Sequence, residues 1–247
     1  VTPTFEMYKV YAQMFGLRLD TVPFGEDFSV DVGNIIPMIT GETNLVVLLN
    51  PNSPVGAVFT GEEFERIAAQ CEKTGTVLLI DEAYYPFGAG AVLDLCRKYP
   101  HVMILRTFSK LCSMAALRVG FLVGNAEDIH LIENAQSTYK VNSVGILFAE
   151  ELLKREDILQ GLQQSVEEGR EYLIQKLGHA GYGYYAAGGN YILVKCANPA
   201  ETAACLKENG ILVKTYKSGI LEGWIRVTLG SRNVMEKFWE SFEKVRQ

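Results

Sequence analysis

Short apolar runs alternate with helical periodicity through the first half of the chain, and this alternation restricts the possible folds most. The runs cover residues 45–49, 77–80, 102–105 and 119–123. The run at 45–49 fits a strand buried on both faces of a sheet. After it, Thr60 and Glu63 have capping-box spacing, and Gly75 closes the helical pattern. A further helix is expected at residues 91–99. The pattern predicts an α/β fold with a doubly wound, mostly parallel sheet.

The second half of the chain has a different pattern. Residues 143–177 have almost continuous helical periodicity and carry many charges. The expected strands after it are 190–196, 211–216 and 224–229, and the expected helices are 199–209 and a last one that begins at a Ser231 cap. We therefore expect a large domain at residues 1–155 and a smaller α+β domain at residues 156–247, with the boundary near residues 153–168 and inside a helix.

Composition and charge argue against several classes of protein. The net charge of −6 argues against a nucleic-acid surface, which is normally basic. No apolar run approaches the ~20 residues that a membrane span needs. The cysteines are odd in number, widely spaced and without a CxxC pair, so we expect reduced thiols in a cytoplasmic protein. We also expect no metal site.

Polar side chains follow three of the expected strands directly. The first strand is followed by Asn50, Asn52 and Ser53, the second by Asp81 and Tyr84, and the third by Thr107, Ser109 and Lys110. Because open α/β sheets bind ligands beyond the carboxyl ends of their strands, we expect these side chains to meet at one edge. A lysine with an acidic partner is the usual protein signature for pyridoxal phosphate, so we expect that cofactor there.

Lys110 and Asp81 carry the expected chemistry of this set. Lys110 is the expected Schiff-base residue and proton shuttle, which requires a free amine. Asp81 is expected to face the cofactor's ring nitrogen and keep it protonated, so that the ring takes up electrons. The plain alternatives are a solvated surface lysine for Lys110 and a helix N-cap or structural ion pair for Asp81.

Other side chains are expected to hold the rest of the cofactor. Ser109 and Arg118 would bind the phosphate, the arginine through its planar fork of donors. Tyr84 would donate to the phenolic oxygen of the ring, and Phe5 would stack on the ring face. The alternatives are core packing for the two aromatic residues and a surface salt bridge for Arg118.

Arg226 lies inside the apolar run 224–229. An arginine is rarely buried without a partner. Since a guanidinium binds a carboxylate through two parallel hydrogen bonds, we expect Arg226 to bind the substrate's carboxylate. The alternative is an intramolecular pair or an outward-facing side chain.

At these residues the chain resembles the class I/II aminotransferase family of fold-type I pyridoxal-phosphate enzymes, and within it the histidinol-phosphate aminotransferase group. The similar segments are residues 3–8, the turn 50–56, residues 81–84, Ser109 and Lys110 with Arg118, residues 139–143 and residues 225–228. The resemblance covers essentially the whole chain. It implies a homodimer that moves an amino group between an amino acid and a keto acid or phosphorylated ketone, in amino acid biosynthesis.

The chain departs from the family pattern at two places. Ser53 stands where the family usually has an asparagine that bonds the ring's phenolic oxygen, and serine reaches less far. Family members also carry an N-terminal region with a glycine-rich phosphate loop and a tyrosine that reaches the partner subunit. We expect this chain to be an N-terminally truncated fragment that binds the cofactor weakly and is nearly inactive by itself.

Alternative functions stay open at this point. The same lysine and aspartate would serve a decarboxylase or a lyase with this cofactor, because the orientation of the scissile bond decides the reaction. A non-catalytic relative that only binds a ligand is a further alternative. A nicotinamide-binding enzyme is disfavoured, since no G-x-G-x-x-G follows any expected strand.

Overall fold

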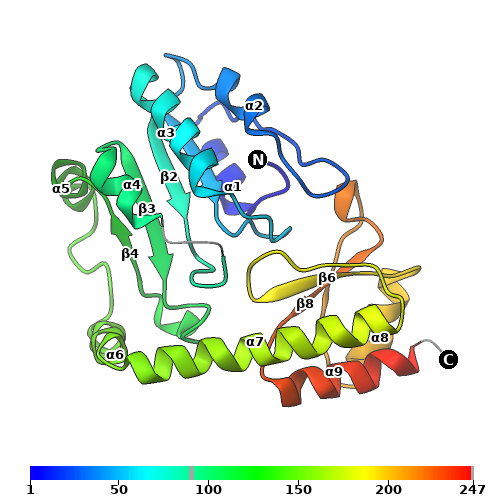
Figure 1. Cartoon of the computed structure of the whole chain (residues 1–247). Coiled ribbons are helices and arrows are strands. Elements are labelled where there is room, and N and C mark those ends of the chain that lie inside the picture. Colours follow the sequence, from blue (N-terminus) through cyan, green and yellow to red (C-terminus); the bar gives the residue numbers. More distant parts are fainter. Residues whose placement is uncertain (89–91, 246–247) are drawn as a thin grey trace.

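The computed structural model describes residues 1–88 and 92–245 and has one sheet in each half of the chain (Figure 1). The first sheet has the strand order β1-β2-β3-β4. Its strands are β1 (Leu45–Leu49), β2 (Val77–Asp81), β3 (Val102–Thr107) and β4 (Gly120–Val123). β1, β2 and β3 are parallel, and β4 is antiparallel to β3. The expected α/β fold with a mostly parallel sheet is confirmed.

Helix α3 (Gly61–Thr74) forms as the sequence predicts and covers the first sheet. Thr60 accepts from the Glu63 amide and Glu63 accepts from the Thr60 amide, which completes the capping box, and Gly75 ends the helix in the left-handed conformation. The helix packs Phe64 and Ile67 against β2 and β3 in the first core. The prediction that β1 is buried throughout is wrong at its start, where Leu45 is 49% exposed.

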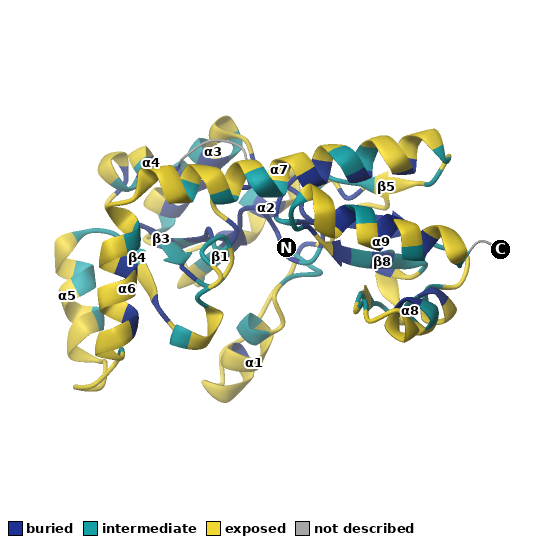
Figure 2. Ribbon diagram, turned by 90° about the horizontal axis from the view of Figure 1, so that it is seen from below, coloured by how far each residue is buried: buried dark blue, intermediate teal, exposed yellow. Residues whose placement is uncertain are grey.

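The remaining elements of the first half surround this sheet. They are α1 (Met7–Met14), α2 (Val32–Ile35), the 3₁₀ turn η1 (Ile36–Met38), α4 (Leu93–Lys98), the 3₁₀ turn η2 (Ala115–Leu117), α5 (Ala126–Asn134) and α6 (Ser143–Leu153). α4 corresponds to the helix predicted at 91–99, of which residue 91 lies outside the described part. α1 projects from the body of the molecule and is largely exposed (Figure 2).

The second sheet is antiparallel and has the order β5-β6-β8-β7. Its strands are β5 (Tyr184–Tyr185), β6 (Tyr191–Lys195), β7 (Lys214–Thr215) and β8 (Trp224–Thr228), and its helices are α7 (Glu156–His179), α8 (Pro199–Glu208), the 3₁₀ turn η3 (Gly219–Leu221) and α9 (Arg232–Lys244). The strand predicted at 211–216 is shorter than expected. Ser231 does sit at the N-cap of α9, but its side chain makes no capping hydrogen bond.

The two halves meet where a turn after β1 packs against a loop before β6. Gly56, with φ of 94°, lets the turn 50–56 close, and a Cβ there would lie 2.9 Å from the Gly188 carbonyl oxygen. Beneath this contact, Val55 and Leu193 share one buried cluster. α7 runs along both halves (Figure 1). The domain boundary at residue 155 stays a prediction.

Residues 1–88 and 92–245 make up the described part of the chain. None of their helices is both long and apolar enough to cross a bilayer. No group of three or more His, Cys, Asp or Glu side chains among them has the arrangement of a metal site.

Candidate active site

Asp81 is the last residue of β2, where the strand leaves the sheet. Its side chain is only 5% exposed. One oxygen, Oδ1, accepts from the Ala83 amide at 2.9 Å, and the other, Oδ2, accepts from the Tyr8 hydroxyl at 2.6 Å. Burial raises the pKa of Asp81, while Tyr8, Ala83 and the charge of Lys110 act in the opposite direction. The site therefore contains a buried carboxylate with donors on both oxygens.

Lys110 follows β3, the neighbour of β2 in the sheet. Its Nζ lies 5.1 Å from the centre of the Tyr84 ring, and the side chain is exposed. Its charge reaches the carboxylate of Asp81 and lowers the pKa of that group. The structure thus brings together Lys110, Asp81 and Tyr84, as the strand-end argument expects.

Thr107 and Ser109 form a compact turn at the end of β3. The Ser109 amide donates to Thr107 Oγ1 at 3.1 Å, and the Thr107 hydroxyl donates to the Val119 carbonyl at 3.2 Å. Arg118 is exposed and has a positive φ of 55°. Its guanidinium donates to the Ala115 carbonyl at 3.0 Å. Arg118 and Ser109 stay predicted phosphate ligands.

The turn after β1 is held by its own asparagines. Asn50 Oδ1 accepts from the Phe59 amide at 3.0 Å, and Asn52 Oδ1 accepts from the Val55 amide at 3.2 Å. Asn52 is fully buried, and its Nδ2 has no hydrogen-bond partner within the described chain. The two asparagines therefore shape the turn, and Asn52 retains one unused donor.

Arg226 of β8 faces this turn across the junction of the two halves. Its Nη1 donates to Ser53 Oγ at 3.3 Å, and its guanidinium carbon lies 4.9 Å from the centre of the Tyr191 ring. The Tyr191 hydroxyl donates to the Asn52 carbonyl, and the ring meets Tyr84 edge to face at 5.1 Å. The arginine thus reaches the turn after β1, and Tyr191 links it to Tyr84.

Several residues of this site have no role that the sequence predicts. Tyr8 lies in the segment 3–8, which resembles the family, and Tyr191 lies in the strand expected at 190–196. Phe5, the expected stacking residue, is 50% exposed and meets the Tyr8 ring at 6.2 Å. Glu82 and Arg106 also pair beside the site, with Arg106 Nε 2.7 Å from Glu82 Oε2.

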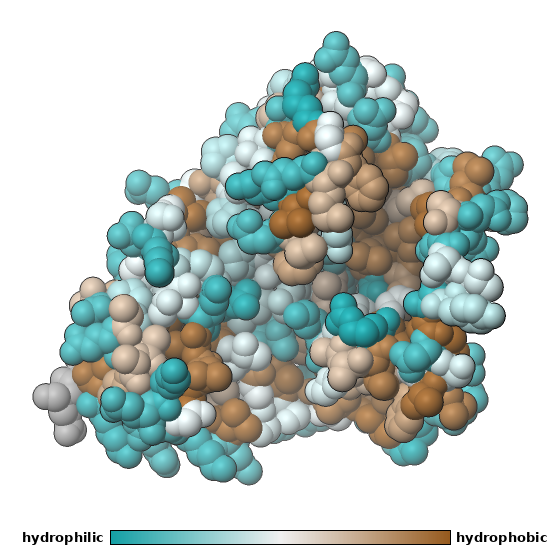
Figure 3. Space-filling model, turned by 180° about the vertical axis from the view of Figure 1, so that it is seen from behind, coloured by the Kyte–Doolittle hydropathy of each residue, from teal (hydrophilic) through white to brown (hydrophobic). Residues whose placement is uncertain are grey.

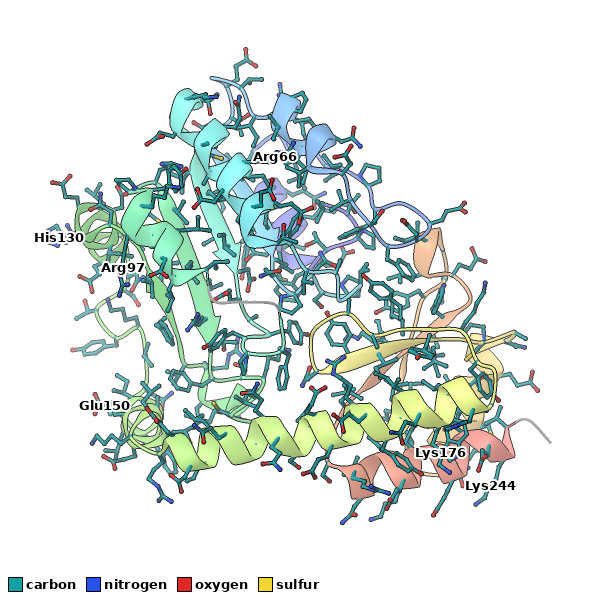
Figure 4. The ribbon with its side chains drawn as sticks, viewed as in Figure 1. Arg66, Arg97, His130, Glu150, Lys176 and Lys244 are labelled. Atoms are coloured by element: carbon teal, nitrogen blue, oxygen red, sulfur yellow. The ribbon has the colours of Figure 1, made fainter. Side chains whose placement is uncertain are left out.

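The residues without a predicted role differ in how far the chain around them indicates their contacts. Asp81 pairs with Leu105 in the parallel register of β2 and β3, so the next residues of the two segments, Glu82 and Arg106, lie side by side. Nothing local marks Tyr8 or Tyr191, because their partners are far away in the sequence. The polar residues labelled in Figure 4, such as His130 of α5 and Glu150 of α6, lie on outer helices and do not belong to this cluster.

The donor set fits pyridoxal phosphate. A lysine amine, a buried carboxylate and a phenol lie together, and these are the groups that an aldehyde, a ring nitrogen and a phenolic oxygen require. Asn52 Nδ2 adds a buried donor without a described partner. Hydroxyls at Thr107 and Ser109 lie at the end of the neighbouring strand.

Solved structures identify the fold class of the chain. The histidinol-phosphate aminotransferase from Clostridium acetobutylicum superposes with a TM-score of 0.90 at 20% identity, covering 98% of this chain and 75% of that one. The enzyme of that name from Sinorhizobium meliloti, solved in complex with pyridoxal-5'-phosphate, superposes with a TM-score of 0.84 at 22% identity, covering 98% and 68%. The chain therefore has the aminotransferase fold.

Sequence comparison identifies the family. The model of class I and II aminotransferases matches residues 1–242. A histidinol-phosphate aminotransferase of Thermoanaerobacter sp. (strain X514) is 34% identical over 232 residues, covering 93% of this chain and 65% of that protein. The chain belongs to the class I and II aminotransferase family. It spans 64 to 70% of the lengths of the curated relatives that it matches.

Proposed function

We propose that this chain carries the cofactor-binding lysine and the carboxylate-binding arginine of a pyridoxal-phosphate aminotransferase that resembles histidinol-phosphate aminotransferases. The observation that carries the proposal is the meeting of Lys110, Asp81 and Tyr84 at the ends of two neighbouring strands. Lys110 Nζ lies 5.1 Å from the Tyr84 ring centre, and its charge acts on Asp81.

Each residue then has a defined task. Lys110 would hold the cofactor by condensing its amine with the aldehyde, with release of water, and would then carry the proton that is moved. Asp81 would face the protonated ring nitrogen, and Tyr84 would donate toward the phenolic oxygen. When bound, pyridoxal phosphate supplies the carbonyl that takes up the amino group and the ring that takes up electrons.

Arg226 supports the choice of an amino acid or keto acid as substrate. It reaches the turn after β1 from the second sheet, through Ser53 and the Tyr191 ring. A guanidinium at this place binds a carboxylate in a fixed orientation. Ser53 occupies the position where the family usually has an asparagine. Because its hydroxyl accepts from Arg226, we assign Ser53 to positioning the arginine.

Reductive trapping tests the proposal even if binding is weak. The chain is mixed with pyridoxal phosphate, reduced with borohydride and digested, and the modified lysine is found by mass spectrometry. We expect the label on Lys110, its loss in Lys110→Ala, and no change in Lys140→Ala, which removes an exposed lysine. Label spread evenly over surface lysines would contradict the proposal.

The reaction class needs its own test. Adding an amino acid alone to the loaded protein should produce pyridoxamine phosphate and the keto acid, which is the first half of transamination. Release of carbon dioxide would instead favour the decarboxylase alternative. A function that survives Lys110→Ala in the full-length protein would favour a non-catalytic relative.

We also propose a homodimer for the full-length protein. Large apolar side chains are exposed at the end of α1 and along α6, among them Met14, Phe15, Leu147 and Phe148. Apolar side chains also gather on the face of the molecule shown in Figure 3. Extended apolar surface of this kind marks contacts with other chains. The cytoplasmic location stays a prediction.

A further inference from the structure

The carboxylate of Asp81 has a neighbour that the proposed function does not use. The hydroxyl of Tyr8, from α1, donates to Asp81 Oδ2 at 2.6 Å across 73 residues of sequence. A distance in this range is typical of a hydroxyl that donates to an ionised carboxylate. The contact joins a largely exposed helix to the end of a buried strand.

The hydrogen bonds leave Asp81 with free acceptor capacity. Oδ1 accepts from the Ala83 amide and Oδ2 accepts from Tyr8. A carboxylate has about four lone-pair sites, so each oxygen keeps one after these bonds are made. Tyr8 and a ring nitrogen can therefore share Oδ2 without competing for the same lone pair.

We propose that Tyr8 is a positioning residue for Asp81, whose hydroxyl holds Oδ2 in place and favours the ionised carboxylate that a protonated ring nitrogen requires. This inference rests on the proposed role of Asp81 toward the cofactor. It adds a residue from α1 that need not touch the cofactor itself.

The charges around the pair agree with this role. Burial raises the pKa of Asp81, and the Tyr8 hydrogen bond is the strongest influence that lowers it, followed by the Ala83 amide and the charge of Lys110. Burial, the charge of Asp81 and the hydrogen bond to Asp81 raise the pKa of Tyr8, and Tyr11 acts in the same direction. The phenol therefore stays protonated, and remains a donor, across the neutral range.

A matched pair of variants on one helix tests the inference. Tyr8→Phe removes the hydroxyl that donates to Asp81, and Tyr11→Phe removes one from a side chain that is 48% exposed. The first readout is the titration of the Asp81 carboxyl carbon by NMR, without cofactor. We expect the midpoint to rise in Tyr8→Phe and to stay unchanged in Tyr11→Phe.

The second readout is the affinity for pyridoxal phosphate, followed by absorbance. We expect about tenfold weaker binding in Tyr8→Phe, the effect of one lost hydrogen bond to a charged group, and no change in Tyr11→Phe. The absorbance of the bound cofactor should also change its pH dependence in Tyr8→Phe only.

The outcomes separate this inference from the proposed function. An unchanged carboxyl midpoint in Tyr8→Phe overturns the inference, and so does a raised midpoint with unchanged cofactor binding. A raised midpoint with weaker binding supports it. Asp81→Asn tests the proposed function instead, because cofactor binding equal to that of the wild-type chain would contradict the role of Asp81 itself.

Discussion

The end of β2 and the middle of β8 each present a charged side chain to the site, but in different ways. Asp81 is the last residue of a parallel strand whose preceding residues, such as Leu78 and Ile80, are fully buried. Arg226 lies between Ile225 and Val227, which pack into the second core. The first charge lies where a strand ends, and the second lies within one.

The difference follows from how the two sheets are covered. A parallel sheet is typically buried on both faces, so polar groups are available mainly beyond the strand ends. Successive residues of a strand point to opposite faces, so a strand with one buried face can carry a charge in its middle. In β8, Ile225 and Val227 face the core, and Arg226 faces Ser53 and Tyr191.

The strand-end charge should control cofactor binding. Asp81→Ala removes the proposed partner of the ring nitrogen, and we expect the affinity for pyridoxal phosphate to fall by about two to three orders of magnitude. The measurement is a titration followed by absorbance. Asp94→Ala, which removes an exposed carboxylate of α4, is the control. A loss of affinity below about threefold in Asp81→Ala would contradict the division of tasks between Asp81 and Arg226.

The buried faces of the two sheets should matter equally for stability. Leu78→Ala in β2 and Ile225→Ala in β8 each remove a side chain that is fully buried. We expect both to lower the free energy of unfolding by about 2–5 kcal/mol, through lost burial and a residual cavity. Urea unfolding measures it. A change near zero in either variant would show that its sheet does not depend on that core.

The mid-strand charge should control substrate binding more than cofactor binding. Arg226→Gln removes the planar fork, and we expect keto acid binding to the cofactor-loaded protein to weaken about tenfold to a hundredfold. Arg232→Gln, on α9, is the control because its ion pair with Glu236 is exposed. If Arg226→Gln lowers the affinity for pyridoxal phosphate as strongly as Asp81→Ala does, the two positions do not have separate tasks.

The smallest expected effect is on the pH dependence of stability. Burial raises the pKa of Asp81 above its reference value of 3.8. The Asp81 carboxyl therefore stays protonated up to a higher pH in the folded chain than in the unfolded chain. The contribution of this carboxyl to the stability of the fold is present in full below the reference pKa, and it is lost as the pH rises through the folded-state pKa. Relative to the wild-type chain, Asp81→Asn should gain stability as the pH rises from about 4 toward neutral.

Urea unfolding of both proteins without cofactor, at matched ionic strength, measures this difference. Burial also raises the pKa of Glu82, but that group is present in both proteins and cancels in the comparison. A difference that does not vary with pH would contradict the burial of an ionisable Asp81.

Much of the first half could be predicted from local pattern. The apolar runs became β1, β2 and β3, and Thr60, Glu63 and Gly75 made the predicted helix ends. The direction of β4 could not be predicted, because an apolar run reads the same in a parallel and an antiparallel strand. The strand predicted at 211–216 is mostly irregular. Only Lys214 and Thr215 of this apolar run pair with β8, and an apolar run does not show which of its residues will pair.

The placement of the candidate site residues could be predicted where they follow strands directly. Lys110, Asp81 and Tyr84 needed only the rule that parallel strands end at one edge. The contact of Tyr8 with Asp81 spans 73 residues, and that of Arg226 with Ser53 spans 173. No local pattern specifies contacts at such separations.

By itself, the amino-acid sequence determined most of the strands, the ends of α3 and the polar groups that follow the strands, because these depend on hydrophobic periodicity and on neighbours a few residues apart. Only the tertiary structure decided that Tyr8 donates to Asp81 and that Arg226 faces the turn after β1. Both contacts depend on how α1 and the second sheet pack against the first, through burial of residues that are distant in the chain.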